Sequence, residues 1–340
     1  MIVVTGGTGY IGSHTVVELL ANGREVVILD DLSNSDISII DSISVISGVR
    51  PEFHCVDLTN AIELHKVFDQ IGKRATAVIH FAAKKAVGES VQQPLEYYRN
   101  NIHSLINVMS EMDRFAISSL VFSSSCTVYG QPDEFPVTEK TPRKAAESPY
   151  GNTKSICEDI IRDTSKASNS RSISLRYFNP IGAHVSGLIG ELPSGAPNNL
   201  VPYVTQTAAG IRQELTIFGG DYPTADGTCI RDYINVVDLA KAHIRALERL
   251  ENEKCDSNYE VFNIGTGSGF SVLEVVRAFE AATGVPVRYK IGERRAGDIT
   301  EIYADTQLAN TVLNWKAEIC LEDSLRSAWN WEQNHRKRKE

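Results

Sequence analysis

Several features that would mark a special class of protein are missing from this sequence of 340 residues. Its six cysteines form no C-x-x-C pair and show no zinc-ligand spacing with histidine, so we expect reduced thiols and no metal site. No apolar run approaches the roughly 18 residues of a membrane span. There is also no basic excess: 34 Lys and Arg against 43 Asp and Glu give a net charge of −9, which argues against binding to nucleic acid. Met1 leads directly into an apolar run, which leaves no room for a targeting segment. We therefore expect a soluble cytoplasmic protein.

The first half of the chain alternates short apolar runs with stretches of helical length. The expected strands are 2–4, 26–29, 53–56, 77–80, 120–122 and 173–177, and the expected helices are 11–21, 61–71, 94–113 and 150–164. Apolar strands separated by helices predict βαβ units and a parallel sheet that is covered on both faces. The fold class is therefore α/β, with a doubly wound, Rossmann-like sheet whose ligands bind beyond the carboxyl ends of the strands.

The pattern changes after about Pro180. Residues 182–202 are rich in Gly, Pro, Ser and Asn and predict a loop. Shorter elements follow: a helix near 201–213, a strand at 215–218, a helix at 237–249, a strand at 261–264 and a helix from about Val272, where Ser271 and Glu274 form a capping box. We expect a first domain at 1–180 and a smaller α/β substrate domain at 181–340, with segments such as 235–265 returning to the first. The basic run 335–339 predicts a frayed, solvated terminus.

A glycine-rich loop follows the first expected strand. Gly6, Gly9 and Gly12 form G-x-x-G-x-x-G between a strand and a helix, where glycine permits a tight turn and lets the backbone approach a pyrophosphate. Asp30 ends the second strand 18 residues after Gly12. An acid there suits ribose hydroxyls and repels a 2′-phosphate, which favours NAD over NADP.

Tyr150 and Lys154 stand four residues apart on one face of an expected helix. A nearby ammonium and a cationic nicotinamide should lower the pKa of the phenol, which could then exchange a proton with a sugar hydroxyl. Ser125 directly follows the strand segment 120–124 and could hydrogen-bond the same reacting oxygen. Each signal alone is common by chance, but together they favour catalysis.

An ordered series of motifs resembles the extended short-chain dehydrogenase/reductase family, and within it the UDP-hexose 4-epimerases. The resemblance covers nearly the whole chain and rests on T-G-G-T-G-Y-I-G-S-H (5–14), K-A-V-G-E-S-V (85–91), P-L-E-Y-Y (94–98), F-S-S-S-C-T-V-Y-G (122–130), S-P-Y-G-N-T-K (148–154), L-R-Y-F-N-P-I-G-A-H (175–184), P-N-N-L (197–200), D-Y-P-T-A-D-G-T (221–228) and R-D-Y-I-N-V-V-D-L-A (231–240). It implies an isomerase of carbohydrate and galactose metabolism that retains NAD and interconverts UDP-glucose and UDP-galactose through a transient 4-keto sugar. Tyr150 would be the base, Lys154 would bind the nicotinamide ribose, and Ser125 would hold the C4 oxygen.

The resemblance also implies two sets of binding residues. The expected cofactor set is Gly6, Gly9, Tyr10, Ile11, Gly12, Asp30, Asn34, Ser35, Asp57, Leu58, Phe81, Ala82, Lys85, Asn100, Tyr150, Lys154 and Phe178. The expected UDP-sugar set is Lys85, Ser125, Tyr150, Asn179, Asn199, Leu200, Phe218, Arg231, Arg295, Asp298 and Ile302. Two arginines in the second set could bind a diphosphate. Relatives pair two helices into a dimer interface, so we expect a homodimer through the helices from Pro94 and Tyr150.

Two positions depart from the family pattern. The residue that controls the sugar pocket falls at Ile302, where the family carries tyrosine for simple hexoses and a small residue for N-acetylated sugars. Isoleucine is intermediate in volume, so we expect at least partial conversion of UDP-GlcNAc and UDP-GalNAc, unless an alignment shift places Tyr303 in the pocket. Asn235 replaces the histidine of many relatives, without an assigned role.

Three alternatives remain open at this point. A 4,6-dehydratase or a decarboxylase of the same family needs a carboxylate after Ser125, where this chain has Cys126 and Thr127. A non-catalytic dinucleotide sensor would need neither Tyr150 nor Lys154.

Overall fold

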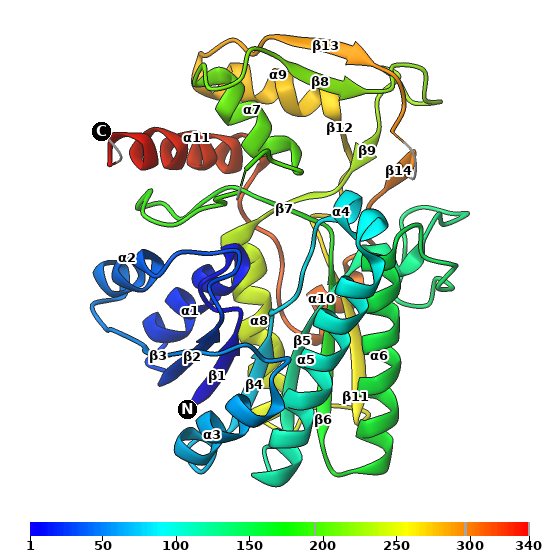
Figure 1. The fold of residues 1–340 in the computed structure, drawn as a ribbon. Helices are drawn as coiled ribbons and strands as arrows, with labels where there is room; N and C mark the ends of the chain where they lie inside the picture. Colours follow the sequence, from blue (N-terminus) through cyan, green and yellow to red (C-terminus); the bar gives the residue numbers. More distant parts are fainter. Residues whose placement is uncertain (194, 296–297, 339–340) are drawn as a thin grey trace.

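The computed structural model describes residues 1–193, 195–295 and 298–338 and is built on one large parallel sheet (Figure 1). Its seven strands run in the order β11-β6-β5-β4-β1-β2-β3. Their bounds are Ile2–Thr5 (β1), Val26–Asp30 (β2), Glu52–Cys55 (β3), Ala77–His80 (β4), Ser119–Ser125 (β5), Arg171–Tyr177 (β6) and Tyr259–Ile264 (β11). The prediction of a doubly wound parallel sheet is confirmed.

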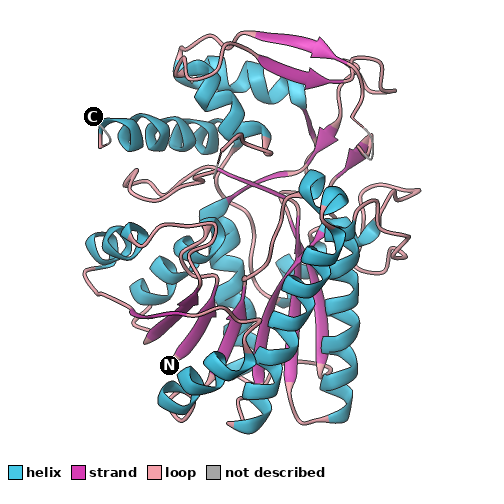
Figure 2. Cartoon of the chain, in the orientation of Figure 1, coloured by secondary structure: helices cyan, strands magenta, loops and turns pink. Residues whose placement is uncertain are grey.

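Helices cover both faces of this sheet (Figure 2). On one face, α1 (Tyr10–Ala21), α2 (Ser38–Ser47) and α8 (Val236–Glu251) enclose an apolar cluster with β1, β4 and β6. On the other face, α3 (Ala61–Ile71), α5 (Pro94–Arg114) and α6 (Pro149–Ala167) enclose a second cluster. Because both faces are buried, the strands read as continuous apolar runs, which explains why they were visible in the sequence.

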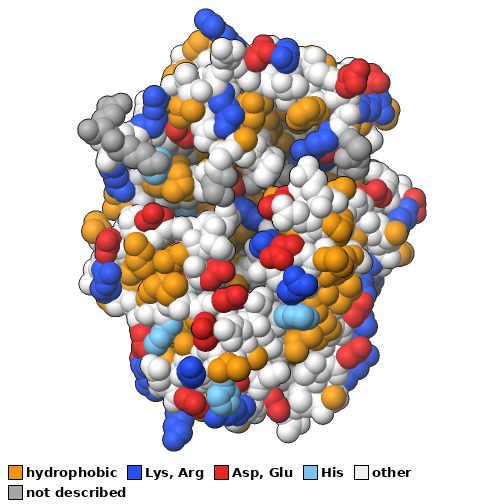
Figure 3. All heavy atoms as spheres, in the orientation of Figure 1, with side chains coloured by type: hydrophobic (Ala, Val, Ile, Leu, Met, Phe, Trp, Pro, Cys, Tyr) orange, Lys and Arg blue, Asp and Glu red, His pale blue; other side chains and the backbone are white. Residues whose placement is uncertain are grey.

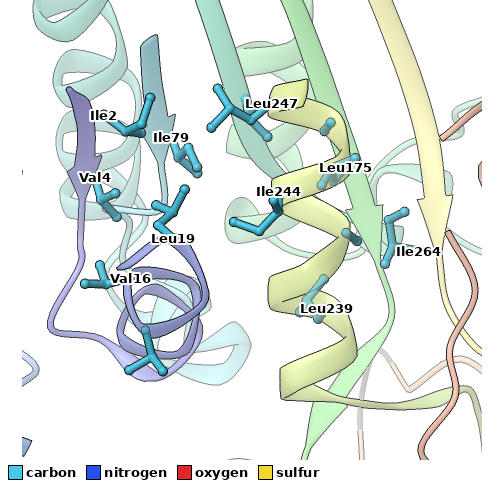
Figure 4. Packing of buried hydrophobic residues seen from close by; sticks show 14 of the residues in the cluster. Ile2, Val4, Val16, Leu19, Ile79, Leu175, Leu239, Ile244, Leu247 and Ile264 are labelled. Carbon is cyan, nitrogen blue, oxygen red and sulfur yellow. The ribbon is translucent and has the colours of Figure 1, made fainter. Parts of the chain in front are cut away.

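The chain returns to the large sheet after leaving it. Strand β11 pairs in parallel with β6, and helix α8 packs against α1. Figure 4 shows Leu239, Ile244 and Leu247 of α8 in the same core as Leu19 of α1 and Ile264 of β11.

The remaining elements form a smaller part above the carboxyl ends of the large sheet (Figure 1). Its helices are α7 (Leu200–Ala208), α9 (Val272–Thr283) and α11 (Leu321–Lys337), which share an apolar core. Three small sheets accompany them: β7 (Asn179–Ile181) with β10 (Tyr233–Asn235), β8 (Leu215–Phe218) with β13 (Tyr289–Gly292), and β9 (Ile230–Arg231) between β12 (Phe270–Ser271) and β14 (Glu301–Ile302). The short elements α4 (Val87–Gln92), η1 (Cys126–Tyr129) and α10 (Gln307–Val312) complete the described fold.

Two predictions for the second half need correction. The helix expected near 201–213 ends at Ala208, because Gly210 takes a positive φ of 74° that terminates it. The basic run expected to be frayed is helical as far as Lys337, where positive charge suits the negative end of the helix dipole. There the Arg336 guanidinium donates to the Ala209 carbonyl at 2.6 Å. Lys339 lies outside the described residues.

The expected capping box is confirmed at the start of α9. The Ser271 hydroxyl accepts from the Glu274 amide, and the Glu274 carboxylate accepts from the Ser271 amide. In the described parts of the chain, every helix is too short or too polar to cross a lipid bilayer.

Candidate functional site

A cavity of about 630 Å³ opens at the carboxyl ends of the large sheet, where the strand order reverses between β1 and β4. Doubly wound sheets bind ligands at this point. On the face drawn in Figure 3, acidic and basic side chains gather along the crevice between the lower and upper parts of the molecule. Except for Phe178, the whole expected cofactor set lines the cavity: Gly6, Gly9, Tyr10, Ile11, Gly12, Asp30, Asn34, Ser35, Asp57, Leu58, Phe81, Ala82, Lys85, Asn100, Tyr150 and Lys154.

The glycine loop is shaped by contacts that a side chain would prevent. Gly6 has a φ of 68°, and a Cβ placed there would lie 2.7 Å from the Ala82 amide nitrogen. A Cβ on Gly12 would lie 2.2 Å from the Gly6 carbonyl oxygen. Helix α1 then begins after Gly9, and among the described residues no side chain caps its first turn. The amides of that turn and the helix dipole make this terminus suitable for a pyrophosphate.

Asp30 is buried at the end of β2 and is held by the same loop. Its carboxylate accepts from the Thr8 amide at 3.1 Å and from the Leu32 amide at 3.0 Å. The Ser35 hydroxyl lies 3.4 Å from it, within the cavity lining. The acid is therefore fixed beside the glycine loop, as a ribose-binding carboxylate should be.

Tyr150 and Lys154 lie on α6, which begins with Ser148 as its N-cap and Pro149 in its first turn. The Lys154 ammonium donates to the Ser123 carbonyl at 2.7 Å and lies 5.9 Å from the centre of the Tyr150 ring. Ser125 ends β5 and is buried. Helix α6 therefore brings a phenol and an ammonium to the end of β5, beside the cavity.

The electrostatics of Tyr150 depend mainly on its burial. Burial raises the pKa of its phenol well above the usual value, nearby Tyr177 adds to this, and hydrogen bonding with Ser125 acts in the opposite direction. Burial also lowers the pKa of the Lys154 ammonium to about 8. Removal from water therefore dominates in the protein by itself, and the expected lowering, which includes the charge of a bound nicotinamide, stays a prediction.

A carboxylate that the motifs did not reveal links the two sides of the cavity. Glu191 Oε1 accepts from the Lys85 ammonium at 3.2 Å and from the Asn199 amide at 2.6 Å. Lys85 also lies 5.7 Å from the Tyr10 ring, and the Tyr10 hydroxyl donates to the Gly182 carbonyl at 2.6 Å. The loop between β7 and α7 is thus attached to the glycine-loop side of the site.

Four expected UDP-sugar residues form a second group, outside the residues that line the cavity. The Asp298 carboxylate lies 2.7 Å from Arg295 and 3.9 Å from Arg231. The Arg295 guanidinium lies 5.7 Å from the centre of the Phe218 ring, which is 46% exposed. The structure therefore places two cations, one acid and one exposed aromatic ring together.

Of the other expected UDP-sugar residues, Lys85, Tyr150 and Asn199 line the cavity, and Asn179, Leu200 and Ile302 lie elsewhere. Asn179 lies in β7, and Leu200 begins α7. Ile302 is only 2% exposed and packs in a cluster with Cys126 and Phe178.

The Tyr303 ring lies 6.1 Å from that of Phe135, a residue that packs against the same cluster as Ile302. The choice between Ile302 and Tyr303 for the sugar pocket stays a prediction.

Residues missed by the sequence analysis also line the cavity. The hydroxyls of Ser123 and Tyr177 are 2.7 Å apart, and burial raises the pKa of Tyr177 to about 12. Tyr177 is the last residue of β6, so the rule that ligands meet carboxyl ends of strands could have identified it. No local pattern could have identified Glu191.

Asn235, left without a role, is the N-cap of α8. Its side chain accepts from the Val237 amide at 2.8 Å and donates to the Ser324 hydroxyl at 3.0 Å. It therefore joins the start of α8 to α11.

The chain is similar throughout its length to known enzymes. Residues 2–265 match the model of the NAD dependent epimerase/dehydratase family. The UDP-glucose 4-epimerase of Haemophilus influenzae is 49% identical over 337 residues, which cover 99% of this chain and 98% of that protein. The solved UDP-glucose 4-epimerase of Stenotrophomonas maltophila, with bound NAD and formylated UDP-arabinopyranose, superimposes with a TM-score of 0.95 at 45% identity and covers 99% of both chains.

The solved enzyme of Bifidobacterium longum, in complex with NAD+ and UDP, gives a TM-score of 0.94 at 43% identity and covers 98% of both chains. The resemblance to the epimerases that the motifs suggested is thereby confirmed. The chain belongs to the NAD-dependent epimerase/dehydratase family.

Proposed function

We propose that this protein is an NAD-dependent 4-epimerase that interconverts UDP-glucose and UDP-galactose. The observation that carries the proposal is the placement of Tyr150 and Lys154 in the same cavity as the glycine loop and Asp30. The full-length similarity to UDP-glucose 4-epimerases supports it.

The cavity fits NAD. Glycines at positions 6 and 12 let the loop adopt a conformation that a Cβ would prevent. The loop leads into the start of α1, which suits the pyrophosphate. Asp30 would hold a ribose, and Lys154 would hold the ribose of the nicotinamide. When bound, NAD would provide the acceptor and the donor of the hydride at C4 of the sugar, so the reaction would need no net oxidant.

The chain's own groups move the proton. Tyr150 takes it from the C4 hydroxyl and returns it to the same oxygen, which Ser125 holds by a hydrogen bond. Because burial disfavours the phenolate, positive charge beside the ring is needed for this step, and Lys154 supplies part of it. The burial of Tyr150 and Lys154 also keeps water away from the 4-keto sugar.

The cluster of Phe218, Arg231, Arg295 and Asp298 is the proposed binding place for the nucleoside diphosphate. Two guanidinium groups can bind phosphate oxygens in a bidentate manner. The exposed ring of Phe218 offers a face for uracil to stack on. Asn199, which precedes α7 and lines the cavity, would add a polar contact to the substrate.

We also infer that the enzyme accepts N-acetylated UDP-hexoses in part. Ile302 shares its apolar cluster with Cys126, the residue after Ser125, so its volume limits the space next to the reacting sugar. Isoleucine is smaller than tyrosine and leaves room that a ring would fill.

A homodimer through α5 and α6 is a further proposal, together with a cytoplasmic location. The two helices pack side by side, and Leu95 and Ile106 of α5 are exposed apolar residues. Such side chains favour burial against a second copy.

Proton NMR of the anomeric signals tests the proposed activity. Purified protein is incubated without added cofactor with UDP-galactose and, separately, with UDP-GalNAc. We expect full conversion of the first to equilibrium and slower conversion of the second. Retained NAD without turnover of either sugar would favour a dinucleotide sensor. Loss of water would favour a dehydratase, although neither Cys126 nor Thr127 provides the carboxylate which that reaction needs. A decarboxylase would leave both sugars unchanged, because neither carries a carboxylate that could leave as carbon dioxide.

A further inference from the structure

Helix α6 carries a buried acid one turn after Lys154 that the mechanism above does not use. The side chain of Glu158 is 2% exposed and that of its partner Arg176, on β6, is 6% exposed. A buried ion pair contributes little net stability, and apolar replacement of such pairs is often neutral or stabilising. Its geometry is therefore the more informative property.

Glu158 holds β5 next to the catalytic serine. Its Oε1 accepts from the Ser124 hydroxyl at 2.6 Å, and one turn earlier Lys154 donates to the Ser123 carbonyl at 2.7 Å. Helix α6 thus binds two consecutive residues of β5, and the next residue is Ser125. The same helix carries Tyr150 in its first turn.

The carboxylate itself is fixed on its other side. Arg176 donates to both oxygens of Glu158, from Nε at 2.8 Å and from Nη2 at 2.6 Å. Its Nη1 donates to the Tyr129 hydroxyl at 3.1 Å, which in turn donates to Asn263 at 2.6 Å. Bidentate pairing leaves the carboxylate little rotational freedom. The position of Glu158 is therefore set by β6, η1 and β11 together.

A second arginine connects this network to the segment between the two catalytic residues. Arg143 Nη1 lies 3.4 Å from Glu158 Oε2 and 3.1 Å from the Ser155 carbonyl. The segment from Ser125 to Tyr150 is therefore connected to Glu158 in three ways. Ser124 connects its start, Arg143 connects its middle, and α6, which carries both Tyr150 and Glu158, connects its end.

We propose that Glu158, held by Arg176, is a positioning residue that fixes the Ser125 hydroxyl relative to the Tyr150 phenol. This inference rests on the proposed function, in which both groups contact the C4 oxygen. A displacement of about 1 Å between reacting groups can lower a rate roughly a hundredfold, so loss of this contact affects the chemical step.

The test compares Glu158→Gln, Ser124→Ala, the double variant and a matched control, Asp163→Asn. Asp163 is another acid on α6, but its side chain is 69% exposed and it pairs with Arg162 rather than with Arg143 or β5. Four quantities are measured for each protein: kcat and KM for UDP-galactose, retained NAD per protomer, and Tm.

We expect kcat to fall roughly tenfold to a hundredfold in E158Q and in S124A, while KM and retained NAD stay at wild-type values. The double variant should be no slower than the slower of the two single variants, because both changes weaken the same contact between Glu158 and Ser124 and their effects do not add. Asp163→Asn should match the wild type in kcat. Ser124→Ala leaves the Glu158–Arg176 pair intact, so it carries the test if E158Q does not fold.

A purely structural role would lower Tm in E158Q and S124A and leave kcat of the folded protein unchanged, which would overturn the inference. Additive losses in the double variant would overturn it as well. A wild-type protein that converts no UDP-galactose would instead overturn the proposed function. The two failures are therefore distinguishable.

Discussion

The two halves of the proposed site are built in different ways. On the cofactor side, the glycine loop meets Ala82 backbone with no room for a Cβ, and Asp30 is buried with its carboxylate already hydrogen-bonded. On the UDP-sugar side, the Arg295 side chain is 57% exposed and Phe218 stands open at the end of a two-stranded sheet. A rigid half suits a cofactor that stays bound through many turnovers, and an open half suits a substrate that must enter and leave.

Removal of the Tyr150 hydroxyl should have the largest effect, since it lies where the two halves meet. Tyr150→Phe should lower kcat by roughly 10²–10⁴-fold, the usual contribution of a positioned acid–base group. Retained NAD and KM should change little. Steady-state kinetics with UDP-galactose measure this, and a variant with near wild-type kcat would remove Tyr150 from the mechanism.

A methyl group in the glycine loop should impair NAD binding and leave the UDP-sugar side of the site unchanged. In Gly12→Ala, the new Cβ meets the Gly6 carbonyl oxygen, so the loop must move and most of the retained NAD should be lost. The matched control is Gly88→Ala, where a Cβ meets nothing within 4 Å. Absorbance of cofactor released from the purified proteins gives the NAD content. Equal NAD content in both variants would mean that the loop does not hold the pyrophosphate.

Removal of one arginine should weaken binding of the UDP-sugar and leave NAD binding unchanged. Arg295→Gln should raise KM about tenfold and leave retained NAD unchanged. The effect is modest because an exposed guanidinium contributes less binding free energy than a buried charge-assisted hydrogen bond does. Its neighbour Arg294 pairs with Asp221 and stacks on Tyr222, so Arg294→Gln serves as the control. A similar rise in KM in both variants would contradict a specific diphosphate contact.

A larger side chain at position 302 should narrow the substrate specificity. Ile302→Tyr should suppress conversion of UDP-GalNAc far more than that of UDP-galactose, since the ring fills the space next to the sugar. Parallel NMR time courses on the two substrates measure the ratio. Equal losses on both would contradict the assignment of Ile302 to the pocket.

The smallest expected effect is the pH dependence of kcat/KM that Lys154, on the cofactor side, should cause. Burial places the pKa of Lys154 at about 8, and its protonated form supports Tyr150. The value of kcat/KM should therefore fall as the pH rises through about 8, where the ammonium loses its proton. A pH profile that stays flat up to pH 9 would show that the charge of Lys154 is not required.

The same difference between the halves explains what the sequence could predict. The strands of the large sheet, the glycine loop and Asp30 follow from local patterns, because a buried strand and the loop after it are encoded side by side. The other cofactor residues came from the resemblance to the epimerase family. Helix α4 has only six residues and contains Gly88, and α2 is rich in serine and isoleucine, so neither shows a clear helical period. Glu191 and the Glu158–Arg176 pair depend on contacts between segments far apart in the chain, which no local motif records.

The central claim is that hydride leaves C4 and returns to it within one site, and that only the hydroxyl proton moves through Tyr150. Epimerisation of UDP-galactose in D2O, followed by proton NMR and mass spectrometry of the UDP-glucose formed, tests this directly. We predict full retention of protium at C4, because the hydride never exchanges with solvent. Deuterium at C4 would show that the carbon-bound hydrogen is removed as a proton, and would contradict the account.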